Sequence, residues 1–366
     1  MKVNLTTGLV GLPLVGKTTI FNLLTDSNLE TSNFLSGKTE TNMGQARVPD
    51  KRIDFLSNMF KPRKTTYAQI QVHDVPGLVR GASQGQGVGN KFMDNIRNVD
   101  MLVHVVRAFN NPDVPHVEDS INPMRDIETI NTELLFADIE LLDKRIERIQ
   151  QGKKIKKEQL KELEVLKRLL AALENEQPLS MVELNEDEQQ LLQHYSFFTE
   201  KPLLLVINID EEQFQSNDYP HKAEVEAWAA QRDVPVLEIC GQIEMEISQL
   251  PPEDREMFME DLGITDSGIN RLARATYERL GLISFFTTGE DEVKAWTIRK
   301  NTDAKRAAGK IHSDIERGFI RAEVVKYQDL VDVGSMAKLK DLGKYRLEGK
   351  EYIVQDGDII NFRFNV

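Results

Sequence analysis

The sequence predicts an α/β fold that carries an inserted helical arm and is followed by a smaller α+β module. The first observation is a series of apolar runs of strand length that alternate with helical stretches, as in a sheet covered by helices. The second and third are changes of composition near residues 126 and 280, where this alternation stops. The predicted strands of the first part lie at residues 3–10, 70–73, 101–106, 203–207 and 234–239.

The inserted arm is predicted from a long stretch, about 126–176, that is rich in Glu, Lys, Arg and Leu. Apolar residues recur there at three- and four-residue spacing, the period of an amphipathic helix. Residues 151–154 interrupt the repeat, so we expect an antiparallel pair of helices, a coiled-coil arm, within an insertion at 126–200. Ordinary core helices are the alternative, but the stretch is far longer than a crossover requires. The spaced residues are Ile139, Leu142, Ile146, Ile149, Leu160, Leu163, Leu166, Leu170 and Leu173.

After about Leu280 the sequence changes to short strand-like runs separated by glycines. We expect strands at 293–298, 321–325 and 352–354 and a helix at 303–315. A segment of this size is within the range of an independent domain. The predicted domains are therefore residues 1–280, which contain the arm, and residues 281–366.

The composition excludes several classes of protein. Hydrophobic residues make up 40% of the chain and charged residues 29%, which is ordinary for a globular protein with a sizeable core. No apolar run approaches the length of about 20 residues that spans a bilayer, and no charged-then-apolar leader follows Met1, so a cytoplasmic location is expected. The single cysteine, Cys240, excludes an internal disulfide framework. A net charge of −13 argues against a surface that is basic throughout, although a local basic patch remains compatible with it.

The first chemical motif, Gly11-Leu12-Pro13-Leu14-Val15-Gly16-Lys17-Thr18, matches the Walker A phosphate loop at every fixed position. It lies between a predicted strand and the opening of a predicted helix, as this loop requires. Its glycines let successive backbone N–H groups turn toward phosphate oxygens, Lys17 supplies a positive charge, and Thr18 offers a hydroxyl to Mg²⁺. A glycine-rich turn is the alternative, but such a turn would not need the Lys–Thr pair. The motif predicts nucleotide binding.

The second motif, Asp74-Val75-Pro76-Gly77, ends a strand downstream of the phosphate loop, in the order expected of a P-loop NTPase. Asp74 would hold Mg²⁺ through water, and the Gly77 N–H would contact the γ-phosphate; alone, the pattern is a common turn. Small GTPases place a water-orienting glutamine directly after this glycine, and Leu78 cannot replace it. The glycine-rich segment 81–89 that follows is expected to be a flexible switch.

The third motif, Asn208-Ile209-Asp210-Glu211, occupies the place where guanine-specific domains have Asn-Lys-x-Asp. Ile209 replaces the lysine that covers the base, and Glu211 replaces the aspartate that accepts two hydrogen bonds from guanine. Moving that carboxylate relaxes or redirects the choice of base, which argues against strict GTP specificity. A degenerate GTPase, or Asp210 acting after a one-residue slip, is the alternative.

Taken together and in this order, the motifs resemble the YchF (Obg-like) ATPases of the translation-factor-related GTPases. The likeness runs from end to end. It implies a Ras-like P-loop G domain with a coiled-coil insertion and a C-terminal, β-grasp-like TGS domain. It also implies a preference for ATP over GTP, slow Mg²⁺-dependent hydrolysis and association with the ribosome. The segments that carry it are 11–19, 74–82, 85–92, 208–211, 295–298, 307–320 and 352–360.

The resemblance also assigns roles to particular residues. Leu78 fits the hydrophobic residue that replaces the catalytic glutamine, and His116 matches a loop histidine proposed as the family's substitute for it. From the residues alone, an exposed bystander is the alternative for that histidine. Mg²⁺ would be held by Thr18, Thr39 and Asp74. The residues expected to bind the nucleotide are Leu14, Val15, Gly16, Lys17, Thr18, Thr19, Asn208, Ile209 and Glu211.

Two positions depart from the family pattern. Leu14 stands where the family has an asparagine that helps hold K⁺ in related GTPases, so a dependence on K⁺ is in doubt. Lys38 replaces the threonine of the first switch, and Thr39 follows one residue late. Either Thr39 serves after a register shift or Mg²⁺ is held less tightly, as in a divergent paralogue.

The leading functional hypothesis is an ATP-hydrolysing switch that contacts ribosomal RNA and proteins through the arm and the TGS domain. The arm is basic near its predicted tip, which suits an RNA backbone, although a charge run is usually a solvated face. A GTPase of ribosome assembly and a nucleotide-gated binding protein with negligible turnover are the alternatives. The basic residues of the arm are Lys153, Lys154, Lys156, Lys157, Lys161, Lys167 and Arg168.

Overall fold

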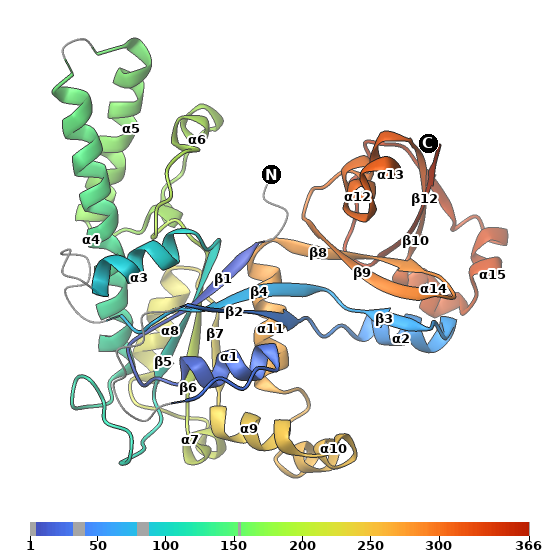
Figure 1. The fold of residues 1–366 in the computed structure, drawn as a ribbon, viewed down its shortest axis with the longest axis horizontal. Helices are drawn as coiled ribbons and strands as arrows, with labels where there is room; N and C mark the ends of the chain where they lie inside the picture. Colours follow the sequence, from blue (N-terminus) through green and yellow to red (C-terminus); the bar gives the residue numbers. More distant parts are fainter. Residues whose placement is uncertain (1–4, 32–40, 79–87, 153–154, 366) are drawn as a thin grey trace. The chain divides into compact units, whose positions relative to one another are not determined.

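The computed structural model describes residues 5–31, 41–78, 88–152 and 155–365. The chain forms two compact units (Figure 1). The first comprises residues 1–45 and 71–269, and the second comprises residues 46–70 and 270–366. None of the helices in the described ranges is both long enough and apolar enough to cross a membrane.

The first unit is built on a six-stranded sheet in the order β2-β4-β1-β5-β6-β7. β1 is parallel to β4 and β5, and β6 is parallel to β5 and β7. Every residue of β1 and β5 is buried, as expected for strands covered on both faces. The bounds are β1 Thr6–Val10, β2 Asn42–Arg47, β4 Gln69–Asp74, β5 Met101–Arg107, β6 Leu203–Asn208 and β7 Val236–Ile239.

Helices cover this sheet and complete its core. α1 packs against α9, and α4 packs against α8 and β5. Residues from β5, β6, α4 and α8 share one apolar cluster that includes Val106, Ile207, Ile127 and Val225. The helices are α1 Lys17–Thr25, α3 Val88–Arg97, α7 Glu211–Ser216, α8 Lys222–Gln231, α9 Gly241–Gln249 and α10 Pro252–Asp261. The next helix, α11 Gly268–Arg279, starts at the end of this unit and belongs mostly to the second.

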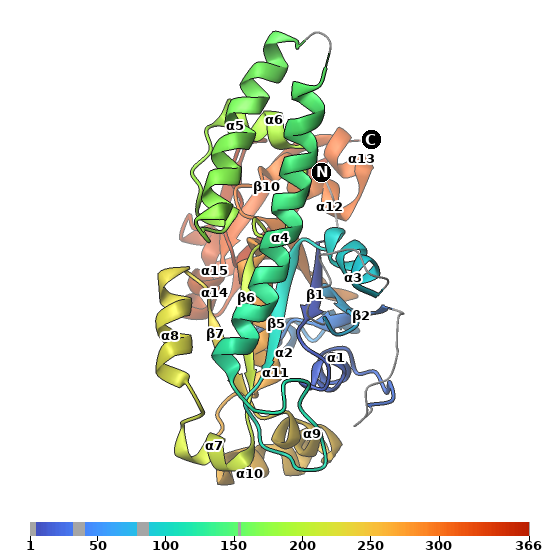
Figure 2. The same cartoon turned by 90° about the vertical axis from the view of Figure 1, so that its left-hand side faces the viewer.

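The predicted arm is present as two long antiparallel helices that project from the sheet (Figure 2). They are α4, Pro123–Gln150, and α5, Lys157–Glu174, followed by the short helices η2, Leu179–Met181, and α6, Glu186–Leu192. Asn122 caps α4 by accepting a hydrogen bond from the Arg125 N–H, with Pro123 in the first turn, where its missing N–H costs nothing. The buried seam includes Leu142, Ile146, Ile149, Leu166, Leu169 and Leu173.

A buried carboxylate ties the lower part of the arm to the chain that returns from it. Asp138 of α4 is 0% exposed and accepts hydrogen bonds from the N–H groups of Phe198 and Thr199 at 2.9 and 2.8 Å. The Thr199 hydroxyl donates a third at 2.7 Å. The helical period of the arm predicts only apolar contacts between its two helices. It could not predict the contact of Asp138 with Phe198 and Thr199, because these residues are about 60 positions apart in the sequence.

We expect Asp138→Ala to destabilise the protein, because it leaves buried backbone N–H groups without an acceptor. The cost is about 3 kcal/mol of unfolding free energy. Urea unfolding at pH 7.5 measures it, above the pKa of about 6 to which burial raises this carboxyl. Asp143→Ala, an exposed position on the same helix, is the matched control. Equal midpoints for the two variants would contradict the role of Asp138.

The second unit is a six-stranded sheet in the order β11-β10-β12-β8-β9-β3. β10 is antiparallel to β11 and β12, β8 is antiparallel to β9, and β12 and β8 are parallel. The strands are β3 Lys64–Thr66, β8 Leu282–Thr288, β9 Glu292–Arg299, β10 Phe319–Lys326, β11 Arg346–Glu348 and β12 Asp358–Phe364. The helices are α2 Lys51–Phe60, α12 Ala304–Ile311, α13 Ser313–Arg317, α14 Tyr327–Val333 and α15 Met336–Asp341.

This unit contains a segment that the sequence does not connect with it. Residues 46–70 contribute α2 and the edge strand β3, which pairs with β9. Arg52 of α2 bonds to Asp50 and to Asp356, and Asp356 also accepts the Ser284 N–H. The second unit therefore includes residues 46–70, which a single boundary at residue 280 would leave in the first. The domain boundary at 280 stays a prediction. The strand expected at 352–354 is wrong, since Ile353 forms only an isolated bridge with Asp303.

Candidate nucleotide-binding site

The phosphate loop follows β1 and enters α1, as the sequence predicts. Gly11 and Gly16 have φ angles of +149° and +94°, a region that L side chains rarely adopt. A Cβ on Gly11 would lie 2.3 Å from the Val105 carbonyl oxygen, and one on Gly16 would lie 2.3 Å from Asn208 Nδ2. Both glycines are therefore required by conformation and by space. Leu14 also has a positive φ, of 62°.

Lys17 begins α1 and is 7% exposed. Its Nζ donates to the carbonyl oxygens of Gly11 at 3.1 Å and Leu12 at 2.6 Å. Burial lowers the pKa of Lys17 to about 8, while the nearby charge of Asp74 acts in the opposite direction. The lysine is thus held over the loop by two carbonyls, where a phosphate would provide a stronger partner.

The structure brings two of the predicted Mg²⁺ ligands together. Asp74 ends β4 opposite Leu9 of β1 and is 5% exposed. The Thr18 hydroxyl donates to Asp74 Oδ2 over 3.0 Å. A hydroxyl and a carboxylate side by side are oxygen ligands of the kind that Mg²⁺ prefers, so this pair fits the ion. Lys38 and the third predicted ligand, Thr39, lie outside the described residues.

The segment after Asp74 packs tightly against the phosphate loop. The Leu78 N–H donates to the Gly11 carbonyl over 3.0 Å, and a Cβ on Gly77 would lie 2.8 Å from the Pro13 nitrogen. The Leu78 side chain is 1% exposed, so it belongs to the core. The predicted switch segment 81–89 falls mostly outside the described residues, and the contact of Gly77 with phosphate stays a prediction.

The third motif, residues 208–211, contacts the phosphate loop through its first residue, Asn208. Asn208 is 5% exposed; its Nδ2 donates to the Val15 carbonyl at 3.0 Å, and its Oδ1 accepts the Gly241 N–H at 3.2 Å. Ile209 is 3% exposed, and its N–H donates to the Ile239 carbonyl, so its side chain lies in the core. Asn208 therefore joins the phosphate loop to the turn after β7.

The two acidic residues of this motif differ in their surroundings. Asp210 caps α7 by accepting the Gln213 N–H at 2.9 Å, and its other oxygen accepts the Asn110 N–H at 3.0 Å. Glu211 is exposed in the first turn of α7. With both oxygens of Asp210 engaged, Glu211 is the more accessible carboxylate.

His116 lies in the loop that follows β5, with a side chain that is 5% exposed. Its Nδ1 accepts the Glu118 N–H at 3.1 Å, which makes Nε2 the protonated nitrogen, and Nε2 donates to Asp126 Oδ2 at 2.9 Å. The side chain of His116 is therefore buried, which differs from the exposed bystander considered from the sequence. Both ring nitrogens are engaged, so a catalytic role requires the ring to leave Asp126.

Two buried polar residues of β5 were missed by the sequence reasoning. Arg107 is 2% exposed and donates to the carbonyls of Phe109, Asn111, Val114 and Pro115, which fixes the loop that carries His116. His104 is 1% exposed, and burial lowers its pKa to about 3, so it is neutral at physiological pH. The sequence could have indicated both residues, because a histidine and an arginine stand out in the otherwise apolar run of β5.

A glycine-rich loop between β1 and α1, a buried lysine and an adjacent Thr–Asp pair at the ends of the parallel strands β1 and β4 define a P-loop NTPase. Comparisons with known proteins agree. Residues 6–144 match the family described as "50S ribosome-binding GTPase", and residues 282–365 match the YchF GTPase C-terminal family, described as "Protein of unknown function (DUF933)".

Curated relatives extend over the full chain. The Ribosome-binding ATPase YchF of Bacillus subtilis is 46% identical over 99% of this chain and 100% of its own length. That of Escherichia coli O157:H7 is 42% identical over 98% and 99%, and Obg-like ATPase 1 of Caenorhabditis elegans is 39% identical over 99% and 92%. The Schizosaccharomyces pombe YchF GTPase structure superposes with a TM-score of 0.87 at 32% identity, covering 99% and 98%. The chain belongs to the YchF family, which confirms the resemblance and the predicted fold class.

Proposed function

We propose that this protein binds ATP with Mg²⁺, hydrolyses it slowly and acts as a nucleotide-dependent switch at the ribosome. The observation that carries the proposal is the phosphate loop with Lys17 held over it and the Thr18–Asp74 pair beside it. Relatives that cover nearly the whole chain are named ribosome-binding ATPases, which supports the same activity.

The residues of the loop bind and orient the triphosphate. Lys17 exchanges the carbonyls of Gly11 and Leu12 for β- and γ-phosphate oxygens, and the backbone N–H groups of residues 14–19 surround the phosphates. Thr18, Thr39 and Asp74 would hold Mg²⁺, which neutralises charge on the phosphates when it is bound. Asn208 keeps the loop in place through Val15.

Slow hydrolysis follows from the groups near the second motif. Leu78 is apolar and buried, so it orients no water. His116 would serve that purpose only after it leaves Asp126 and Glu118. The engaged histidine is also the observation that favours the alternative of a nucleotide-gated binding protein with negligible turnover. Single-turnover phosphate release, compared with Lys17→Ala as a blank, separates the two.

The choice of ATP over GTP rests on the third motif. Ile209 offers no cation to cover the base, and Glu211 places its carboxylate one methylene further out than an aspartate. Adenine would then be read by backbone groups near Ile209. Competition binding with ATP and GTP tests this proposal, and a large preference for GTP would replace it with a GTPase of ribosome assembly.

We expect K⁺ not to stimulate turnover, because the side chain of Leu14 has no oxygen to coordinate the ion. Phosphate release measured in KCl and in NaCl at equal ionic strength should agree within error. Leu14→Asn restores the amide oxygen and is the matched variant that should gain a K⁺ effect. Stimulation of the unchanged protein by K⁺ would contradict this expectation.

Association with the ribosome is proposed to involve the tip of the arm. Lys156, Lys157 and Lys161 are exposed there, and Arg168 is already paired with Glu188 over 2.9 Å. We expect the triple change of these lysines to glutamate to reduce cosedimentation with ribosomes at 100 mM salt by at least about tenfold. Glu174→Lys, at the other end of α5, is the control. Unchanged cosedimentation of the triple variant would remove the arm tip from the proposal.

A further inference from the structure

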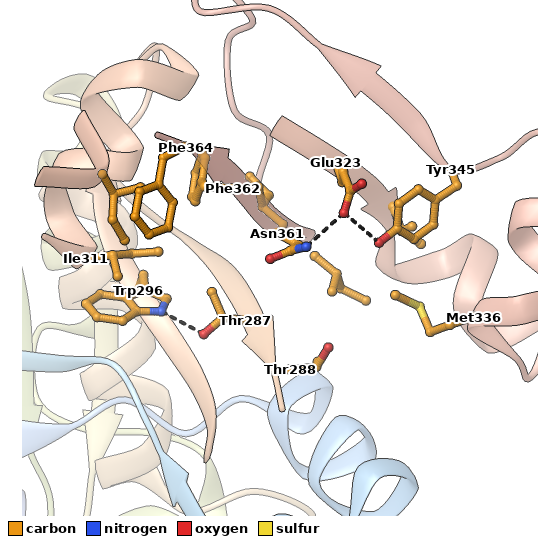
Figure 3. Close-up of a pocket in the computed structure, with 14 residues that line it drawn as sticks. Thr287, Thr288, Trp296, Ile311, Glu323, Met336, Tyr345, Asn361, Phe362 and Phe364 are labelled. Carbon is orange, nitrogen blue, oxygen red and sulfur yellow. Dashed lines mark hydrogen bonds between the residues drawn. The ribbon is translucent and has the colours of Figure 1, made fainter. Parts of the chain in front are cut away.

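The two central strands of the second unit's sheet, β12 and β8, separate and leave a hollow of about 500 Å³ between them (Figure 3). The strands pair at Ile359 and Phe286, and the Gly357 N–H donates to the Ser284 carbonyl over 2.8 Å just before that point. The hollow lies beyond it, between Thr287–Thr288 of β8 and the last residues of β12. Small-molecule sites have volumes of roughly 300–1,000 Å³, so this hollow is large enough for a ligand.

One side of the hollow is aromatic. Trp296 of β9, Phe362 and Phe364 of β12 and Ile311 of α12 face it together (Figure 3). The indole N–H of Trp296 donates to Thr287 Oγ1 over 2.9 Å, which fixes the orientation of that ring. Phe364 is 43% exposed, so its ring stands at the mouth. Such a wall suits a flat aromatic group, because ring faces and edges attract one another in addition to their apolar contact.

The other side is polar and already ordered. Glu323 is 6% exposed and accepts hydrogen bonds from Asn361 Nδ2 at 2.8 Å and the Tyr345 hydroxyl at 3.3 Å, and it pairs with Arg363. Burial raises the pKa of Glu323, but the bonds from Asn361 and Arg363 outweigh it and keep the pKa below its ordinary value. The carboxyl is therefore a fixed anion at neutral pH.

The acceptors of this polar side are turned to the hollow. Since the amide nitrogen of Asn361 donates to Glu323, its carbonyl oxygen points the other way, toward Thr287 (Figure 3). Of the about four lone-pair sites of a carboxylate, Asn361, Tyr345 and Arg363 occupy three at Glu323, so one acceptor site remains there in addition to Asn361 Oδ1. Among the described residues that line the hollow, Glu323 is the charged one, and none of them offers a cation to an anionic group.

We propose that this hollow binds a flat, neutral aromatic ring with N–H donors along one edge, as in a nucleobase that carries an amino group. The ring lies against Trp296 and Phe364, and its donors reach Asn361 Oδ1 and Glu323. Any phosphate stays outside the mouth. Uracil, with one N–H between two carbonyls, fits less well than adenine or cytosine. A free nucleoside and an unpaired base at the end of an RNA strand share this chemistry.

The chain contains two tryptophans, so a Trp228→Phe variant leaves Trp296 as a fluorescent reporter in the hollow. The full-length variant, with a non-hydrolysable ATP analogue and Mg²⁺ saturating the phosphate loop, is titrated with adenosine, cytidine, uridine and a short single-stranded RNA ending in adenine. We expect adenosine and cytidine to change the emission with an affinity at least about tenfold above that of uridine. Repeating the titration with Lys17→Ala excludes a signal from the phosphate loop.

Two further variants in this background test the walls separately. Glu323→Gln removes an acceptor, and Phe364→Ala removes an exposed ring whose loss leaves the core intact. Each should weaken binding at least about tenfold, whereas the exposed Glu351→Gln should leave it unchanged. Binding of nucleosides with this dependence supports a free ligand, and binding of RNA alone with this dependence supports an RNA end. No response of Trp296 to any probe at millimolar concentration, or a response that neither variant alters, overturns the proposal.

Discussion

Replacing Gly16 by alanine is expected to lower ATP affinity by about 100-fold, because it displaces the phosphate loop as a whole. The added Cβ would lie 2.3 Å from Asn208 Nδ2, at a residue with a φ of +94°. The side chain of Asn208 must then move, and it loses its bonds to the Val15 carbonyl and the Gly241 N–H. The backbone N–H groups that surround the phosphates lose their arrangement with it.

The same change also reduces stability. A left-handed conformation costs an alanine about 1–2 kcal/mol, and the broken bonds of Asn208 add about as much again. Gly263→Ala is the matched control, because Gly263 has a φ of +68° and nothing within 4 Å of its Cβ position. It should lose about 1 kcal/mol of stability and bind ATP normally. Calorimetric titration with ATP and Mg²⁺ measures the affinity of both variants. Equal ATP affinities of Gly16→Ala and Gly263→Ala would mean that the loop is not the phosphate site.

Local sequence patterns predict the parts of the fold that depend on residues close together in the sequence. The phosphate loop follows from the fixed spacing of Gly11, Gly16 and Lys17, since the backbone geometry needs glycine at the first two of these positions. The arm follows from its helical period, and Leu142, Ile146 and Leu166 of the predicted seam are buried. Leu160, however, is 49% exposed, because the helical repeat of about 3.6 residues per turn places it on the face of α5 opposite the buried Leu169.

Features that depend on distant residues could not be predicted in this way. β3 consists of Lys64, Thr65 and Thr66, which show no apolar alternation, and its partner β9 lies more than 200 residues away in the register Lys64 with Glu292. The burial of Asp138 and Arg107 depends on backbone groups of other segments. Spacing alone identifies no such partner, which is also why the pairing of His116 with Asp126 was not foreseen.

ATP affinity is expected to fall by about tenfold per pH unit above pH 8, which corresponds to 1.36 kcal/mol per unit. In the free protein burial lowers the pKa of Lys17 to about 8, from 10.5. The triphosphate binds the charged lysine and raises its pKa again, so binding takes up a proton once the pH exceeds 8. Below pH 8 the lysine is already charged, and the affinity no longer changes on its account.

Stability of the free protein moves in the opposite direction. Between the folded pKa of about 8 and the ordinary value of 10.5, the unfolded chain binds more protons at Lys17 than the folded chain does. Below pH 8, Lys17 therefore lowers the free energy of unfolding by roughly 3 kcal/mol. This destabilisation disappears as the pH rises toward 10.5. Measuring ATP binding and urea unfolding from pH 7 to 10 separates these two trends.

Lys17→Arg is the control that isolates the lysine, because a guanidinium stays charged throughout this range. Subtracting its pH profile removes the contributions of all other groups that titrate near pH 9. The remaining difference should show affinity falling and stability rising over the same interval, with proton uptake on binding visible as a dependence of the calorimetric heat on the buffer. A flat difference would mean that Lys17 is already charged at pH 9 in the free protein, so that its two carbonyl contacts outweigh its burial.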